Sequence, residues 1–287
     1  MALALATLGT TTLAGAVLEM QSGPGAAGPV EAVHRFLREP GLVLGGLPFS
    51  LSLLWILGSH ETGHYLACRR YGVDASLPYF LPMLPFPFPF IGTLGAFIRI
   101  RATIPNRNAL FDIGAAGPLA GFAAALPVLV LGLLDSEAAA PPSHPDGVLL
   151  LGEPLLMRWI AGRIFPGLPP GDSISLSPVA VAGWVGLLAT SLNLLPVGQL
   201  DGGHICYSVS RRFHAGVSRF GAAAFLVFAV LRSSYLLWAV LLFVLGRRHP
   251  PVGAEEPPLS PGRRFLAWIC LGVFLVSFIP DPIRILR

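Results

Sequence analysis

Long apolar stretches recur along this sequence, and they restrict the possible fold more than any other feature. A helix needs about 20 mostly apolar residues to cross a bilayer core of ~30 Å. The stretches that we interpret as full or partial spans are 2–18, 41–71, 112–134, 178–195, 217–231, 234–245 and 265–279. We therefore predict an all-α polytopic membrane protein with about six to seven transmembrane helices. Asp112 could cap the third span, and the small residues Gly114, Gly117 and Gly121 in this span should allow other helices to approach it closely.

Composition supports this interpretation and excludes an ordinary soluble domain. Only 12% of the residues are charged and 54% are hydrophobic, whereas soluble domains average about 25% charged residues. The net charge of +4 does not indicate nucleic-acid binding, because the basic residues, all arginines, form short clusters between the apolar stretches. The three cysteines lack the spacing of a metal or redox motif, so we expect free, packed thiols.

The distribution of arginine predicts the orientation in the membrane. Arginines gather on one side of the predicted spans, whereas the segment 135–177 on the other side is acidic. Arginine and lysine mark cytoplasmic loops, so the arginine side should be cytoplasmic. The arginines on this side are Arg69, Arg70, Arg99, Arg101, Arg107, Arg211, Arg212, Arg219, Arg247, Arg248, Arg263 and Arg264.

The sequence between the second and third spans does not predict a helix. Five prolines interrupt the apolar residues 77–91, and proline removes helical hydrogen bonds. A short re-entrant loop lying against a site inside the membrane fits this pattern, and a loop on the membrane surface fits it equally well. Residues 92–101 have the composition and alternation of a β-strand or hairpin edge.

The apolar run that includes Leu53 ends in the pattern H-E-x-x-H, at His60, Glu61 and His64. Side chains four residues apart share one helical face, so both histidines can bind one Zn²⁺, with Glu61 placed to take a proton from metal-bound water. Polar side chains at membrane depth cost roughly 2.5 to 3.5 kcal/mol each. We therefore expect a functional cluster facing a cavity; a chance match is the alternative.

A catalytic zinc site usually has three protein ligands and one open position. Asp201 follows an expected helix break at 196–198 and lies on the same membrane face as His64, so we predict it as the third ligand. The alternative is that Asp201 only caps the helix that resumes at Gly202. His204 is the next donor to consider if Asp201 is not a ligand.

Three blocks of this sequence together resemble the site-2 protease family of intramembrane zinc metalloproteases. They are HETGHY at 60–65, GTLGAF at 92–97 with FDIGAAGPLAGF at 111–122, and NLLPVGQLDGG at 193–203. The resemblance implies a core of three helices that holds Zn²⁺ through His60, His64 and Asp201. It also implies that Glu61 is the catalytic base and that Asn193 holds the substrate or its developing oxyanion. For Asn193, a hydrogen bond between helices is the alternative.

The expected function is hydrolysis of peptide bonds in or near transmembrane helices of other membrane proteins. The strand at 92–101 could hold an unwound substrate by β-augmentation, so we expect substrate binding by Gly92, Gly95 and Phe97, together with Asn193. The segment 135–177 is too short for the inserted peptide-binding domain of many family members, so substrate choice should rest on the membrane region or on partners. A membrane metal carrier or sensor, and an inactive protease-like scaffold, are the alternatives.

The chain divides into three expected parts. Residues 1–40 form a first span and linker, 41–212 the catalytic core with a re-entrant loop and strand at 77–105 and a non-cytoplasmic loop at 135–177, and 213–287 the C-terminal spans. The expected surroundings are the lipid bilayer of a bacterial inner membrane, or of a plastid as the alternative, with the site opening toward the cytoplasm. Nucleic acid is not an expected partner, and the sequence leaves the oligomeric state open.

Overall fold

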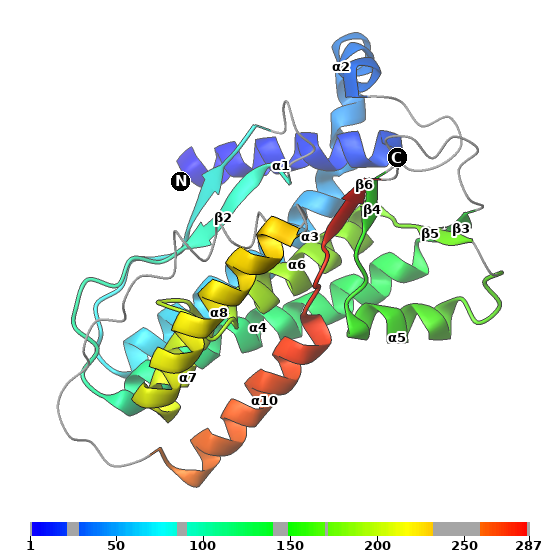
Figure 1. Cartoon of the computed structure of the whole chain (residues 1–287). Coiled ribbons are helices and arrows are strands. Elements are labelled where there is room, and N and C mark those ends of the chain that lie inside the picture. Colours follow the sequence, from blue (N-terminus) through cyan, green and yellow to red (C-terminus); the bar gives the residue numbers. More distant parts are fainter. Residues whose placement is uncertain are drawn as a thin grey trace.

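The computed structural model describes residues 2–21, 29–84, 91–139, 149–169, 172–231 and 259–285, and it is mostly helical (Figure 1). Three helices pack together at its centre: α3 (Leu47–Arg70), α4 (Arg107–Leu134) and α6 (Pro178–Asn193). Their side chains form the largest buried cluster, which includes Phe49, Leu53 and Leu129. The expected core of three helices is therefore present.

Other elements surround this core. The further helices are α1 (Ala2–Gln21), α2 (Pro29–Arg38), the 3₁₀ helix η1 (Pro40–Gly46), α5 (Leu155–Ile164), α7 (Asp201–Val209), α8 (Arg211–Leu231) and α10 (Pro261–Ser277). The strands are β1 (Tyr79–Pro82), β2 (Thr93–Phe97), β3 (Glu137–Ala139), β4 (Leu149–Leu151), β5 (Ser173–Ser175) and β6 (Ile283–Ile285). They form three two-stranded antiparallel sheets, β1–β2, β3–β5 and β4–β6.

Three of the described helical segments are long and apolar enough to cross a membrane: α1, the continuous η1–α3 segment Pro40–Arg70, and α4. Helix α6 has 16 residues and α10 has 17, so each is shorter than the length that a span usually needs. The count of six to seven spans is therefore not confirmed. Helix α8 begins at Arg211 rather than at residue 217, and the stretch 234–245 lies outside the described residues.

Small residues let the three central helices approach closely. A Cβ atom on Gly63 of α3 would overlap the backbone of Ala116 in α4, and one on Gly183 of α6 would lie 2.7 Å from the Cα of Leu129 in α4. Glycine at such crossings allows backbone contact between membrane helices. The close helix approach that the sequence predicts for the third span is confirmed.

The start of α4 differs from the prediction. We expected Asp112 to cap this helix, but the N-cap is Asn106, whose side chain accepts a hydrogen bond from the Ala109 backbone N–H at 2.7 Å. The polar residues Arg107 and Asn108 already belong to the helix. Asp112 therefore lies in the second turn, where its carboxylate pairs with a side chain from α10.

The strand predicted at 92–101 is confirmed as β2, which pairs with β1 in a hairpin. The register places Tyr79 opposite Phe97 and Leu81 opposite Gly95, with an irregularity before Pro82. Proline is tolerated there because it ends the strand. Residues 85–90, which carry most of the expected re-entrant loop, lie outside the described residues.

The expected non-cytoplasmic loop at 135–177 contains α5 and three short strands. Strand β4 from this segment pairs with β6 from the far end of the chain. The indole N–H of Trp184 in α6 donates to the Gly152 carbonyl at 2.7 Å, and the Gly152 N–H donates to the Pro282 carbonyl at 2.9 Å. These contacts attach α6 and α10 to the small sheet that β4 and β6 form.

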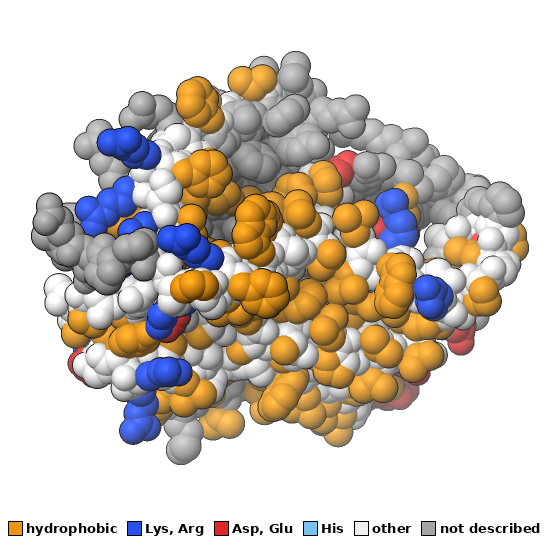
Figure 2. Space-filling view, turned by 90° about the horizontal axis from the view of Figure 1, so that it is seen from below, with side chains coloured by type: hydrophobic (Ala, Val, Ile, Leu, Met, Phe, Trp, Pro, Cys, Tyr) orange, Lys and Arg blue, Asp and Glu red, His pale blue; other side chains and the backbone are white. Residues whose placement is uncertain are grey.

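Apolar side chains cover much of the outer surface. Figure 2 shows them as a broad field on one face, with several arginines gathered at the left edge. Exposed members include Leu131, Trp159, Trp268 and Leu275. A contiguous apolar surface of this extent would be costly in water, and it suits contact with lipid.

The orientation can be tested by labelling introduced thiols. Glu137→Cys and Arg212→Cys place a thiol at exposed positions on the two sides that the arginine distribution predicts. In sealed vesicles of known orientation, a membrane-impermeant maleimide should label only Arg212→Cys from the cytoplasmic side, with wild type as the background because its three cysteines are buried. Labelling of both variants from one side would contradict the topology.

Candidate metal centre

Three metal-binding side chains meet between α3 and α7. His60 and His64 lie one turn apart on α3 with their Nε2 atoms 3.1 Å apart. Asp201 Oδ2 lies 3.4 Å from His60 Nε2 and 3.3 Å from His64 Nε2. Tetrahedral zinc with ligand distances of about 2.0–2.1 Å separates its ligand atoms by roughly 3.3–3.4 Å. The three donor atoms therefore have a spacing that suits one zinc ion.

Asp201 reaches the histidines because the chain breaks between α6 and α7. Helix α6 ends at Asn193, and α7 begins at Asp201 itself. The N-cap position of α7 belongs to Leu200, and no side chain caps this helix. The capping role that we considered for Asp201 is therefore wrong, and its carboxylate lies against His60 and His64 instead.

The ring of His64 is fixed by a second contact. Its Nδ1 lies 2.8 Å from the carbonyl oxygen of Ile113 in α4. Because a carbonyl only accepts, Nδ1 carries the hydrogen and Nε2 keeps its lone pair for a metal. Ile113 could not be predicted from the sequence, because any residue type can supply a backbone carbonyl.

Two glycines of α4 make room for the two imidazole rings. A Cβ atom on Gly117 would overlap the His64 ring, and one on Gly121 would lie 3.1 Å from His60 Nδ1. Their spacing of four residues matches that of the histidines on the antiparallel helix α3. We interpreted these glycines only as sites of close helix packing, and the matching spacing was the signal that could have identified them.

Glu61 and Asn193 lie beside the three donors on one cavity of about 430 Å³. The Glu61 side chain is buried and faces the backbone N–H of Ile98. The side-chain amide nitrogen of Asn193 lies 3.3 Å from His60 Nε2, so it links α6 to α3 and also reaches the donor cluster. Thr190 and Gln199, which we did not predict as site residues, line the same cavity, and so does His204, the alternative third ligand.

The predicted substrate strand is only partly at the cavity. Gly95 and Phe97 of β2 line it, whereas Gly92 does not. Gly92 is buried against α1, where its carbonyl accepts a hydrogen bond from Thr10 Oγ1 at 2.6 Å. Its φ of +79° and the nearby Thr10 backbone leave no space for a side chain. Gly92 therefore fixes the hairpin to α1 and does not contact the cavity.

Backbone groups of β2 and the following residues alternate in direction. The Arg99 N–H donates to Ser76 Oγ at 2.9 Å, on the side of the hairpin partner. N–H directions alternate along an extended chain, so Ile98 and Ala96 present theirs to the other side. That side is the cavity, where Ile98 faces Glu61. The cavity is thus bordered by the edge of β2 that does not pair with β1.

Known proteins with similar sequences are zinc metalloproteases. The protein named "Probable zinc metalloprotease EGY2, chloroplastic" of Arabidopsis thaliana is 34% identical over 247 residues, which are 84% of this chain and 42% of that protein. Its namesake in Oryza sativa subsp. indica is 31% identical over 83% of this chain and 42% of the relative. The Arabidopsis protein named "Probable zinc metalloprotease EGY1, chloroplastic" is 38% identical over 55% of this chain and 28% of its own length.

The chain spans less than half the length of these relatives. The sequence model of peptidase family M50 matches residues 48–231, which carry all the donors of the cluster. This match covers more than half of the chain and includes α3, α4, α6 and α7. The chain therefore belongs to peptidase family M50, the site-2 protease family of zinc metalloproteases.

Proposed function

We propose that this chain is an intramembrane zinc endopeptidase that hydrolyses peptide bonds in or near transmembrane helices of membrane-protein substrates. One observation carries the proposal: three donor atoms lie 3.1–3.4 Å apart with Glu61 beside them at a cavity, and two of the three belong to a helix long enough to span a membrane. Burying a carboxylate at membrane depth is costly, so the presence of Glu61 beside the three donors indicates that it has a function.

The roles of the residues follow from their positions. His60, His64 and Asp201 hold the metal, and a bound zinc ion supplies a Lewis acid that polarises the scissile carbonyl and acidifies water. Glu61 accepts the proton from the attacking water and delivers it to the leaving amine nitrogen. Asn193 directs its amide N–H toward the carbonyl oxygen of the substrate, where negative charge develops.

The edge of β2 is the proposed binding site for the substrate backbone. A transmembrane helix has its N–H and C=O groups paired internally, so a segment must unwind before its backbone can enter the site. An unwound segment could pair with the main-chain groups of Ala96. The position of Ile98 opposite Glu61 would then bring the substrate backbone next to the catalytic carboxylate.

Ala96→Pro tests this edge, because proline removes the N–H donor of residue 96. One main-chain hydrogen bond contributes about 0.5–1.5 kcal/mol, so KM for a membrane substrate should rise roughly two- to tenfold. Ala96→Ser, which keeps the N–H, is the matched control and should behave like wild type. Equal losses in both variants, or a loss that follows the melting temperature, would contradict the strand-edge role.

Cleavage by the purified protein tests the proposed function itself. Zinc-loaded protein should be incubated in detergent with a panel of single-span membrane proteins, and product masses should place the cut within or beside the span. Glu61→Gln provides the inactive control. Cuts confined to soluble regions, or products that form equally with Glu61→Gln, would reject an intramembrane peptidase.

A metal carrier, a metal sensor and an inactive scaffold fit the site less well. Transport requires a series of sites along the membrane, and the described residues hold one group of three metal-binding side chains. Neither transport nor sensing requires Glu61 beside a ligand. An inactive scaffold commonly lacks a ligand or the base, whereas His60, His64, Asp201 and Glu61 all remain.

The proposed location is a membrane, on the basis of the three long apolar helices. The names of the relatives place those proteins in chloroplasts. This agrees with the plastid alternative, and nothing in the comparisons supports a bacterial inner membrane. Substrates and oligomeric state are not specified by any of these relationships.

A further inference from the structure

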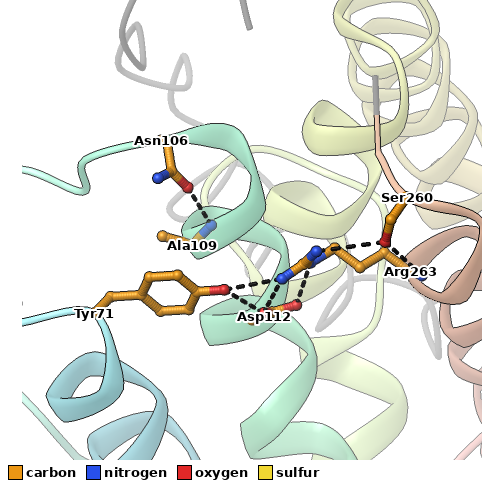
Figure 3. A network of polar contacts seen from close by, with 6 residues as sticks. All are labelled: Tyr71, Asn106, Ala109, Asp112, Ser260 and Arg263. Atoms are coloured by element: carbon orange, nitrogen blue, oxygen red, sulfur yellow. Dashed lines mark hydrogen bonds and ion pairs between the residues drawn. The ribbon is translucent and has the colours of Figure 1, made fainter. Parts of the chain in front are cut away.

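A polar network joins the ends of three helices near the metal centre (Figure 3). Arg263, in the first turn of α10, donates from Nε to Asp112 Oδ1 and from one terminal nitrogen to Asp112 Oδ2, both at 2.8 Å. The hydroxyl of Tyr71, directly after α3, donates to Asp112 Oδ2 at 2.5 Å and accepts from Arg263 at 3.0 Å. All three side chains therefore meet around one carboxylate of α4.

This network lies directly beside the support of a metal-binding residue. Asp112 precedes Ile113, whose carbonyl fixes His64 Nδ1. Tyr71 follows His64 by seven residues, about two helical turns, so both lie on the side of α3 that faces α4. The contacts Tyr71–Asp112 and His64–Ile113 are thus two neighbouring links between α3 and α4. Arg263 stabilises the first of them by contacting both Tyr71 and Asp112.

We propose that Arg263 is a positioning residue for the metal centre, a role that rests on the proposed zinc function. Its pair with Asp112 holds the first two turns of α4 at a fixed distance from α3. The Ile113 carbonyl then remains in place to orient the His64 ring, so that Nε2 points at the metal. Groups that orient metal-binding histidines typically contribute a factor of about 10–100 to metal affinity or activity.

The geometry favours arginine over another cation. A planar guanidinium can engage both carboxylate oxygens at once, whereas lysine acts as a point charge. Arg263 also lies outside residues 48–231, which the family model covers, and is 151 residues from its partner. The contact therefore joins the part of the chain that the family model matches to a helix outside it.

Docking of α10 does not depend on Arg263 alone. Apolar side chains of α10, among them Cys270 and Val273, pack in a buried cluster with Phe111 and Ala115 of α4. Loss of the ion pair should therefore leave the helix in contact while releasing the first turns of α4. The effect on the metal can then be separated from loss of the fold.

The test measures zinc affinity of the full-length protein in detergent by competition with a chelator. Arg263→Gln and Asp112→Asn should each weaken zinc binding by about tenfold. The visible spectrum of the Co²⁺-loaded protein at saturation should also change, because a displaced His64 alters the ligand field. Arg264→Gln is the matched control: Arg264 is the next residue, its side chain is exposed, and its loss should change neither readout.

Each outcome decides one question. Unchanged affinity and spectrum in Arg263→Gln and Asp112→Asn would overturn the positioning role, and failure of wild type to bind zinc would instead reject the proposed function. If Arg263→Gln lowers the melting temperature of the metal-free protein, Arg263→Lys is compared, since it keeps the charge without the two-pronged contact. A zinc affinity of Arg263→Lys that lies between those of wild type and Arg263→Gln supports the proposal. A zinc affinity of Arg263→Lys equal to that of wild type shows that the guanidinium is not needed.

Discussion

Replacing Glu61 by glutamine should abolish peptide cleavage while zinc stays bound. The amide has nearly the same shape as the carboxylate, so the buried position next to His60 is kept, but it cannot accept a proton at neutral pH. General acid–base catalysis typically contributes about 10²- to 10⁴-fold, so kcat should fall by a factor in this range. The measurement is the single-turnover rate on a membrane substrate, together with zinc content.

The melting temperature separates chemistry from folding in this experiment. Glu61→Gln should melt at or above the wild-type temperature, because burying a neutral amide is less costly than burying a charged carboxylate. Asn193→Asp is a useful second variant, since it changes a neighbouring polar group and leaves Glu61 intact. Turnover near the wild-type rate in Glu61→Gln would mean that another group accepts the proton, and the proposed mechanism would be wrong.

Replacing Asp201 by alanine should release the metal. Its carboxylate supplies one of the three donor atoms that lie within 3.1–3.4 Å of each other. Loss of groups that only orient a ligand typically costs about 10–100-fold in affinity, so loss of a ligand itself should cost more than about 100-fold. Zinc content after dialysis against a weak chelator, and zinc affinity by competition, are the measurements.

His204→Ala is the matched control for Asp201. His204 lies on the next turn of the same helix and lines the same cavity, yet it is not part of the cluster of three donors. We expect His204→Ala to keep its zinc. The reverse result, with zinc retained in Asp201→Ala and lost in His204→Ala, would assign the third ligand to His204.

Local spacing made two of the three metal donors predictable. His60 and His64 share a helical face because they are four residues apart, and this holds for any helix. The approach of Asp201 to the histidines depends on how α7 packs against α4, which no local pattern encodes. It was inferred from the helix break at 196–198 and from the family resemblance, and the structure places the carboxylate at the histidines.

The groups that support the cluster were not predictable in the same way. The Ile113 carbonyl belongs to the backbone, so its role depends on position alone. Gly117 and Gly121 are small residues on a helix, and such residues more often mark helix crossings than ligand pockets. Asp112 and Arg263 were interpreted as a helix cap and a cytoplasmic flank, because each role has a local pattern whereas their pairing has none.

The fold was predictable where the apolar residues recur at a regular spacing along the sequence. Alternation at 92–101 indicated a strand, and β2 is found there. The pairing of β4 with β6 joins three-residue strands more than a hundred residues apart, and segments this short carry too little pattern to predict. The count of six to seven spans is not confirmed in the described residues, because an apolar stretch does not specify helical length, as the 16 residues of α6 illustrate.

The contact of Arg263 with Asp112 and the pairing of β4 with β6 both depend on residues 261–285, which are synthesised after the whole core. During synthesis the chain therefore carries His60, His64 and Asp201 before it carries Arg263. Each nascent molecule passes through a stage in which the donors for zinc exist without the side chain that fixes their support. Order of synthesis thus separates the appearance of the proposed metal ligands from the appearance of α10, which carries the proposed positioning residue Arg263.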